Sequence, residues 1–596
     1  MRKLALFLWI VHAAFAQSTP EIRKSVERAL PLLERSAAAF VEQRACVSCH
    51  HNILPILMFH LAHTRGVAVD AAVVRAVEEK TFRSLRGPAA LDDAVQAVTL
   101  NDPTPDDSSL LMAAHAAGLP ADLVTAVYAR RLAAWQRAGH WVTSDFRPPH
   151  SSSIFTATAS AVRAIAFYMP ADLSAERQAC LERARRWLSA AVPASTEDAA
   201  FRLLGLVWAD APAREIAAAR RDLLAMRKSG AWPELPDYPP DAYSTGESLF
   251  ALRQSGVPAS DPAFRRGLGF LVDSQAADGS WRVRTRMISP ADVSPQYFPS
   301  GFPYGKDEYL SYAGSCWAVM ALLSALPESA PGAPATNPGA APQTPPWVRA
   351  ALFGSRQQLA ALLDAGLDPN SKTAGGTTLL MLAAPDAGKV RLLLARGADP
   401  RVRAASGMDA LTIATAYRGT AAAIRALLDG GAELKPPPGV RLRGTALLFA
   451  SMTGDMANVR LLLARGADPA SGTRANTPLA AAVTFGYPDV VRTLIAAGAP
   501  ATLTESSGIN LLHWAVIADR PAVIPVLAKA GVPINATDES GFTPLMYAAT
   551  IDFGDTAALQ ALLQAGADPG IRNGEGRTAP EQARHFHHAR LAGALR

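Results

Sequence analysis

The stretch LLARGADP at residues 393–400 decides the fold of the second half of the chain, because it returns at a regular interval. Its glycine, Gly397, has counterparts spaced 31 to 35 residues apart. They are Gly366, Gly431, Gly466, Gly498, Gly531 and Gly566. A fixed period of this length indicates an array of similar supersecondary units, each of which buries its apolar face only against its neighbours.

A second motif precedes three of these returns, those at Gly498, Gly531 and Gly566. It reads TPL at residues 477–479, NLLHWA at 510–515 and TPLMYAA at 543–549. Proline fits the first turn of a helix, where no N–H partner is needed, and glycine after the next helix takes the left-handed C′ conformation. These stretches resemble the Thr-Pro-Leu-His-x-Ala signature of ankyrin repeats. The resemblance covers residues 347–596 and implies binding of a protein partner through loop tips and the concave helix face.

Residues 327–346, PESAPGAPATNPGAAPQTPP, separate this array from the first half. So many Pro, Ala and Gly residues predict an extended linker. Upstream, residues 17–326 contain small Ala- and Thr-rich helices, each preceded by a loop with glycine and tryptophan. One loop carries Gln275, Asp278, Gly279 and Trp281. Recurrence of one helix–loop–helix unit predicts a closed or stacked helical array.

The Gln275-x-x-Asp278-Gly279-Ser280-Trp281 stretch resembles the repeated Gln/Trp motif of squalene–hopene cyclases and related α/α-toroid proteins. The resemblance implies that Gln275 and Trp281 tie neighbouring helix pairs together. The predicted fold class is therefore all-α, with an α/α-toroid-like helical domain followed by an ankyrin-repeat solenoid.

The catalytic motifs of the toroid families have no full match in this sequence. Cyclases use an Asp-x-Asp-Asp-Thr motif, and the nearest match is Thr104 to Ser108, with Asp106 and Asp107 readable as helix-start acids. The zinc ligands of the related prenyltransferases have no recognisable equivalent. We assign no catalytic residue and leave open whether the protein is an enzyme, favouring that it is not.

The hexapeptide CVSCHH at residues 46–51 holds two of only 4 cysteines in the chain. The spacing CxxCH is typical of c-type haem attachment. Cys46 and Cys49 would bond the haem vinyl groups, and His50 would be an axial ligand of the iron. A Cys46–Cys49 disulfide or redox pair, or half of a zinc site, are the alternatives.

The sixth iron ligand is left unknown by the sequence, because several histidines and a methionine lie near the motif or could reach it. The candidates are His51, Met58, His60, His63, His115, His140 and His150. A lone histidine in an apolar helix is more often part of the core, and Met58 is better explained by packing.

Residues 1–16 have the features of a secretory signal peptide: Arg2 and Lys3, a short apolar run, and the triplet Ala14-Phe15-Ala16. We therefore expect a periplasmic or secreted protein with no transmembrane segment after signal removal. The net charge of +6 is scattered, with no basic run, so we expect no nucleic-acid partner. Cys180 and Cys316 lie in apolar helices and are expected to be buried thiols.

Together these features predict an exported protein that binds a partner through its ankyrin repeats and carries haem c for electron transfer or redox sensing. The alternatives are an interaction scaffold without haem and, less favoured, a terpenoid-cyclase-like enzyme.

Overall fold

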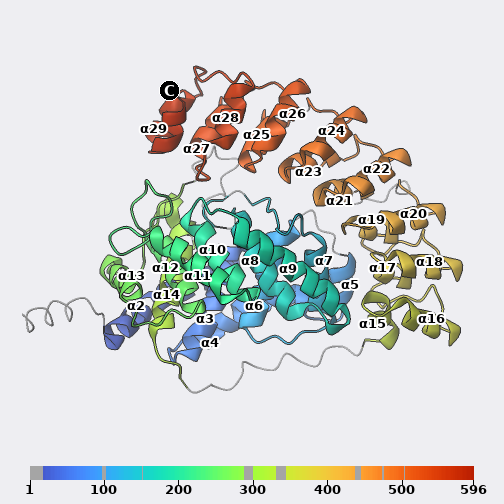
Figure 1. Ribbon diagram of the computed structural model, residues 1–596, viewed down its shortest axis with the longest axis horizontal. Helices are drawn as coiled ribbons and strands as arrows, with labels where there is room; N and C mark the ends of the chain where they lie inside the picture. Colours follow the sequence, from blue (N-terminus) through green and yellow to red (C-terminus); the bar gives the residue numbers. More distant parts are fainter. Residues whose placement is uncertain are drawn as a thin grey trace, which may run out of the picture.

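The structure is a computed structural model in which the chain forms two helical parts (Figure 1). It describes residues 18–96, 102–145, 147–150, 152–286, 300–329, 344–435, 445–472, 476–502 and 504–595, without the side chains of Cys49 and Pro103. The predicted signal peptide and linker residues 330–343 lie outside these ranges. Within them every regular element is a helix and there is no β-strand, so the all-α prediction is confirmed.

Six helices of the first part pack side by side in a ring. They are α3 (Leu54–Thr64), α6 (Pro103–Ala116), α8 (Ile154–Tyr168), α10 (Thr196–Trp208), α12 (Ala242–Gln254) and α14 (Glu308–Ala325). Each packs against the next in chain order, and α14 packs against α3, which closes the ring. Nearly every residue of α14 is buried, as expected for a helix with neighbours on all sides.

A second set of helices packs outside the ring, mostly between consecutive ring helices in the chain. They are α2 (Thr19–Gln43), α4 (Ala71–Thr81), α5 (Ala90–Gln96), α7 (Leu123–Ala134), α9 (Ser174–Ala190), α11 (Ala213–Ala225) and α13 (Pro262–Ser274). Helix α2 packs on α14, α4 and α13, so the first helix of the chain covers the seam where the ring closes.

Three tryptophans, Trp141, Trp232 and Trp281, repeat one arrangement at three corners of the helical domain, after α7, α11 and α13. Each indole N–H donates to a carbonyl near the end of the preceding outer helix, over 2.7, 2.8 and 2.8 Å. Each backbone N–H donates to a Thr or Ser hydroxyl of the following ring helix, over 3.2, 3.1 and 3.1 Å. All three side chains are at most 1% exposed. The loops with Gly and Trp are thus repeats in structure as well as in sequence.

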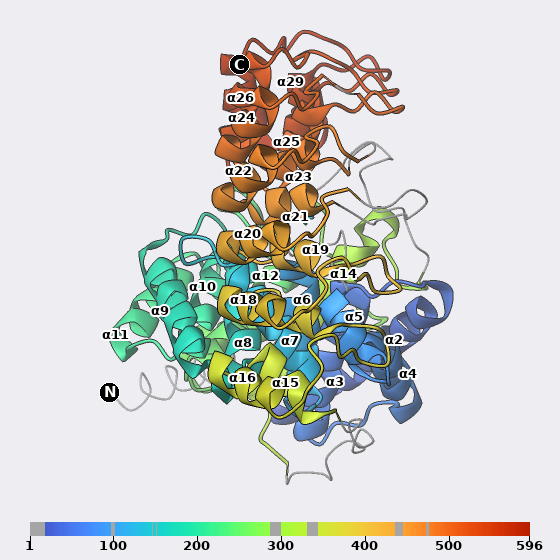
Figure 2. The ribbon, with the colours of Figure 1, turned by 90° about the vertical axis from the view of Figure 1, so that its right-hand side faces the viewer.

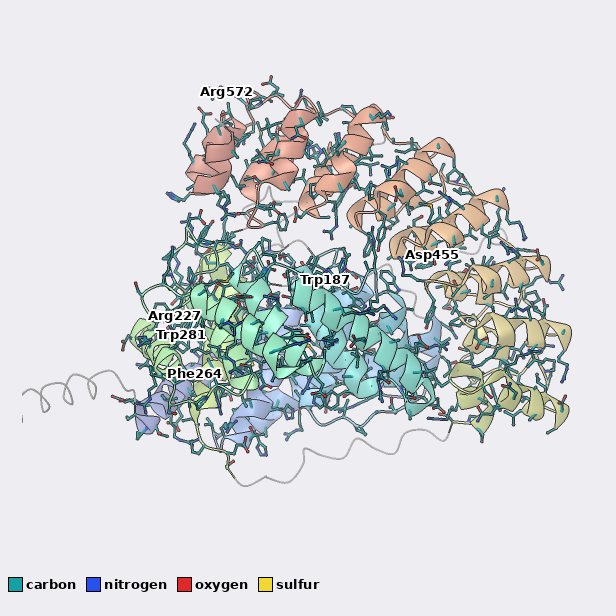
Figure 3. The ribbon with its side chains drawn as sticks, in the orientation of Figure 1. Trp187, Arg227, Phe264, Trp281, Asp455 and Arg572 are labelled. Atoms are coloured by element: carbon teal, nitrogen blue, oxygen red, sulfur yellow. The ribbon has the colours of Figure 1, made fainter. Side chains whose placement is uncertain are left out.

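The motif around Gln275 joins α13 to α2. The Gln275 amide donates to the carbonyls of Ser25 and Gly279, both over 2.9 Å, and its oxygen accepts from Ser25 Oγ at 2.7 Å. Asp278 accepts from the backbone N–H of Ser280 at 3.0 Å and shapes the turn. Gly279 has φ +92°, and a Cβ there would lie 2.3 Å from a carbonyl oxygen of α2. Trp281 packs in the same core as Phe264 of α13 (Figure 3).

The second part is an array of eight helix pairs. Its inner row is α15 (Pro346–Leu352), α17 (Leu379–Ala383), α19 (Ala410–Thr415), α21 (Ala446–Thr453), α23 (Pro478–Thr484), α25 (Leu511–Ile517), α27 (Pro544–Thr550) and α29 (Ala579–His585). Its outer row is α16 (Arg356–Asp364), α18 (Ala387–Ala395), α20 (Ala421–Asp429), α22 (Met456–Ala464), α24 (Pro488–Ala496), α26 (Ile524–Lys529), α28 (Ala557–Gln564) and α30 (Ala589–Ala594). Figure 2 shows the outer row stacked in one column, with the loops projecting to one side.

The recurring motifs act as their chemistry predicts. Thr477 and Thr543 cap α23 and α27, each accepting a hydrogen bond from a backbone N–H three residues on. Gly397 and Gly566 have φ of +90° and +94°, the left-handed conformation that ends a helix. The first unit has both of its helices, α15 and α16.

The array curves around the helical domain with its inner row facing it (Figure 1). At one end, the Arg130 guanidinium donates to the Leu352 carbonyl at 2.6 Å. Near the middle, the Trp135 indole donates to the Ala416 carbonyl at 2.9 Å. At the far end, Arg590 pairs with Asp237 at 2.9 Å. One hydrophobic core also runs through both parts. The concave face that we expected to receive a partner is therefore covered by the chain's own helical domain.

Among the described residues, no single helix is both long and apolar enough to cross a membrane. One bent pair, α8 with α9, meets the criterion by length and composition only.

Candidate functional site

The thiol pair and its histidine lie on a tight turn between α2 and α3. Residues Cys49–Ile53 form one π-helical turn, which leads directly into α3. Ser48 organises the turn: its backbone N–H donates to the Asn52 side chain at 2.9 Å, and its hydroxyl accepts from the His51 N–H at 3.0 Å. Cys46, at the start of the motif, has an exposed free thiol.

His50 points into the protein and is only 9% exposed. Its ring centroid lies 4.7 Å from that of His51, 5.8 Å from Tyr309 and 6.0 Å from His150. Burial, reinforced by the neighbouring His51 and Arg147, holds the pKa of His50 well below its usual range. The imidazole is therefore neutral at physiological pH, which is the state that coordinates a metal.

The predicted candidates for the sixth ligand are spread over the helical domain. Met58 is fully buried in the core, His60 bonds Glu78 at 2.6 Å, His63 is exposed, His115 contacts Arg163 at 3.1 Å, and His140 stacks on Trp187. The two candidates whose rings contact His50 are His51 and His150.

His51 and His150 differ in their surroundings. The His51 ring is sandwiched between Phe40 and Tyr312, with centroid distances of 4.9 and 4.2 Å, and burial lowers its pKa to about 3. The His150 ring stands perpendicular to that of His50, at 88°, and its Nδ1 shares a 3.1 Å hydrogen bond with the Tyr243 hydroxyl. His51 is held as part of the core, whereas His150 faces His50 from a different segment of the chain.

These residues match the donor set of a c-type haem. An exposed thiol begins the motif, and a neutral imidazole directly follows the second cysteine. A second imidazole, from His150, lies beside the first. Haem iron accepts axial imidazole ligands, and the thioether links need only two cysteines on one short turn.

A cavity of about 300 Å³ lies inside the ring, next to this motif. All six ring helices contribute to its lining, which is mostly apolar and includes Phe201, Trp208, Phe250 and Trp317. Among the polar side chains in the wall, two groups contain titratable residues from different helices or loops. One contains His150, Tyr243 and Glu197, and the other contains His115 and Arg163. A concave, largely apolar pocket with a few converging polar groups is the usual form of a small-molecule site.

Of the acids that resembled the cyclase motif, Asp107 has a structural role. Asp107 accepts two hydrogen bonds, each of 2.9 Å, from the Arg131 guanidinium in a buried ion pair. Neither it nor Asp106 lines the cavity. The toroid-motif residues Gln275 and Trp281 likewise lie outside it.

Cys180 and Cys316 are buried free thiols, as predicted. Burial raises the pKa of Cys180 to about 12, so it stays protonated and unreactive.

Comparison with known proteins agrees with the repeat analysis of the second half. A family model of ankyrin repeats (3 copies) matches residues 494–573. The crystal structure of the human ASB11 ankyrin repeat domain is similar over 38% of this chain and 100% of that one, at 24% identity and a TM-score of 0.34. No curated protein matches the chain.

The protein is thus an all-helical chain with ankyrin repeats at its C-terminal end. Ankyrin repeats are protein-interaction units. The resemblance of the helical domain to the toroid families stays a prediction.

Proposed function

We propose that the protein is an exported interaction scaffold whose helical domain carries a covalently attached haem. Cys46 and Cys49 would hold the haem, and His50 and His150 would be its axial ligands. When bound, the haem supplies one-electron redox chemistry, so the protein would transfer electrons or sense redox state. The observation that carries this proposal is the pair of facing histidine rings, His50 buried and His150 half-buried, whose centroids lie 6.0 Å apart next to the CxxCH motif.

The surrounding residues would tune such a site. Phe40 and Tyr312 hold His51, and Ser48 and Asn52 fix the turn that contains Cys49 and His50 in the chain. A buried, apolar environment excludes water and shifts the reduction potential. The exposed position of Cys46 leaves one edge of the motif open to the attachment machinery and to a redox partner.

The scaffold function rests on the ankyrin repeats. Since the inner row of the array contacts the helical domain, a separate partner would bind the outer row or the loop tips. This arrangement leaves the array curved and fixed, rather than free to wrap around a partner.

A haem-staining experiment tests the cofactor. The full chain is expressed in a periplasm that contains cytochrome c maturation proteins, next to a Cys46→Ala/Cys49→Ala variant. We expect a haem signal that survives denaturing electrophoresis in the parent and is absent from the variant. The control Cys180→Ala should keep the signal. A parent without haem, with Cys46 and Cys49 oxidised to each other, would support the scaffold without haem.

Export has its own test. N-terminal sequencing of the mature protein should give Gln17 as the first residue, because the Ala14-Phe15-Ala16 triplet fits signal peptidase. Retention of Met1 in a protein recovered from the cytoplasm would contradict export.

A further inference from the structure

Three buried glutamates converge at one side of the ring. Glu197 lies in the first turn of α10, Glu234 in the loop between α11 and α12, and Glu247 within α12. They are 1%, 3% and 0% exposed. One carboxylate oxygen from each lies within 4.8 Å of the others. Three carboxylates so close together and out of water repel one another strongly unless something compensates their charge.

The protein compensates this charge only in part. Arg286 pairs with Glu234 at 3.1 Å, and the Ser244 hydroxyl donates to the same carboxylate at 2.8 Å. Glu197 accepts a hydrogen bond from the Thr156 hydroxyl at 2.6 Å and also interacts with the Tyr243 hydroxyl and the Glu247 carboxyl. Glu247 is fully buried and pairs with the Glu197 carboxyl, but among the described residues neither of its oxygens has an amide, hydroxyl or cationic donor within hydrogen-bond distance. A fully buried carboxylate without a donor points to a missing ligand.

The charge balance defines that ligand. The three carboxylates carry three negative charges when ionised, and Arg286 supplies one positive charge, which leaves two negative charges. The nearby Asp198 and Asp241 are each satisfied by backbone N–H groups of a helix start, with bonds of 2.9 and 2.8 Å. A single divalent cation would neutralise the remainder.

Access to the cluster comes from the cavity. Glu197 and Tyr243 line the 300 Å³ cavity and also border the cluster. A cation could therefore reach the carboxylates through the cavity.

We propose that Glu197, Glu234 and Glu247 form a binding site for a hard divalent cation, with Ca²⁺ as the preferred ion. Carboxylate oxygens are the ligands that Ca²⁺ takes, and it needs six to eight oxygens. Three glutamates supply fewer, so water or an oxygen-bearing molecule in the cavity completes the coordination. The site adjoins His150 through Tyr243, but none of its three carboxylates is a proposed haem ligand.

Terbium luminescence tests this site on the full chain. Tb³⁺ replaces Ca²⁺ at oxygen sites and emits when a nearby aromatic side chain, here Tyr243 or Trp317, is excited. We expect saturable emission at one Tb³⁺ per chain that is competed by Ca²⁺. Glu247→Gln keeps the side-chain volume and should weaken binding at least tenfold. The control Glu215→Gln alters an acid of α11 that pairs with Arg185 at 2.7 Å, and should bind like the parent.

Thermal unfolding with and without Ca²⁺ shows whether the variant is folded and whether it has lost cation binding. Ca²⁺ should raise the melting temperature of the parent and of Glu215→Gln but not that of Glu247→Gln. The ion-free Glu247→Gln protein should fold normally, because it loses a buried charge without a partner. Two results would overturn the proposal: no saturable binding in the parent, or equal binding in Glu247→Gln.

Discussion

The ring and the ankyrin array are both built from helix–loop–helix units, but the units pack against one another differently in the two parts. Within the array each unit packs on the units before and after it, so the same residues recur at the same positions. In the ring the last helix, α14, packs on the first, α3, and the enclosed space is lined by all six ring helices. Closure therefore creates an interior site, and its residues differ from unit to unit.

Loss of one repeated tryptophan should be among the largest effects in the ring. Trp281→Ala removes a buried indole and its hydrogen bond to the Leu271 carbonyl, and we expect a loss of about 3–5 kcal/mol in the free energy of unfolding. Urea denaturation followed by near-UV circular dichroism measures it. Trp187→Ala, at a half-buried position, should cost less. Equal losses would contradict the special role of the repeated tryptophans.

The contact between the ring and the array is expected to depend on Arg286. Its guanidinium pairs with buried Glu234 and donates to the Asp552 carbonyl of the array at 2.7 Å. Arg286→Met leaves a buried carboxylate unpaired, at a cost of about 3 kcal/mol in stability. Arg282→Met is the matched control, because Arg282 is 67% exposed and its pair with Asp307 is worth about 0–1 kcal/mol. Similar denaturation midpoints for the two variants would refute this role.

The array should show a pH dependence through His513. Burial lowers the pKa of this fully buried side chain to about 4, whereas in the unfolded chain it is about 6.5. The unfolded state therefore binds the proton more readily, and stability falls as pH drops from 6.5 towards 4. The loss is about 2 kcal/mol at pH 5. Urea midpoints at pH 7 and pH 5 should differ less in His513→Gln than in the parent.

Removing a single hydrogen bond between the helical domain and the array should have the smallest effect on stability. Trp135→Phe removes the indole donor to the Ala416 carbonyl and should cost about 1 kcal/mol. Hydrogen exchange of α19 and α21 should become faster in this variant. Trp514→Phe, which removes a bond to Glu505 within the array, is the control and should leave the exchange of α19 unchanged. Unchanged exchange in Trp135→Phe would contradict docking through this bond.

The same contrast explains what the sequence could predict. The array was predictable because its motifs, such as residues 543–549, act on their own helix and its neighbour. The cysteine and histidine motif was also local, and the repeated Trp loops predicted helix pairs.

The residues that meet in the interior of the ring could not be predicted from local sequence motifs. Glu197, Glu234 and Glu247 belong to three different segments, and each has unremarkable neighbours in the sequence. His150 was named only as one of several candidates, because no spacing connects it to His50. The covered concave face was also missed, since Arg130, Trp135 and Arg286 carry no repeat signal of their own.

The central proposal is that the ring supplies both axial ligands to a haem held at the cysteine motif. The reduced absorption spectrum of the purified full chain, matured in the periplasm, tests it most directly. We expect the sharp α and β bands of a six-coordinate low-spin haem c in the parent, and their loss with retention of covalent haem in His150→Ala. His115→Ala, which alters a cavity histidine outside the His50 cluster, should keep the parent spectrum. A parent spectrum without any haem bands would contradict the proposal.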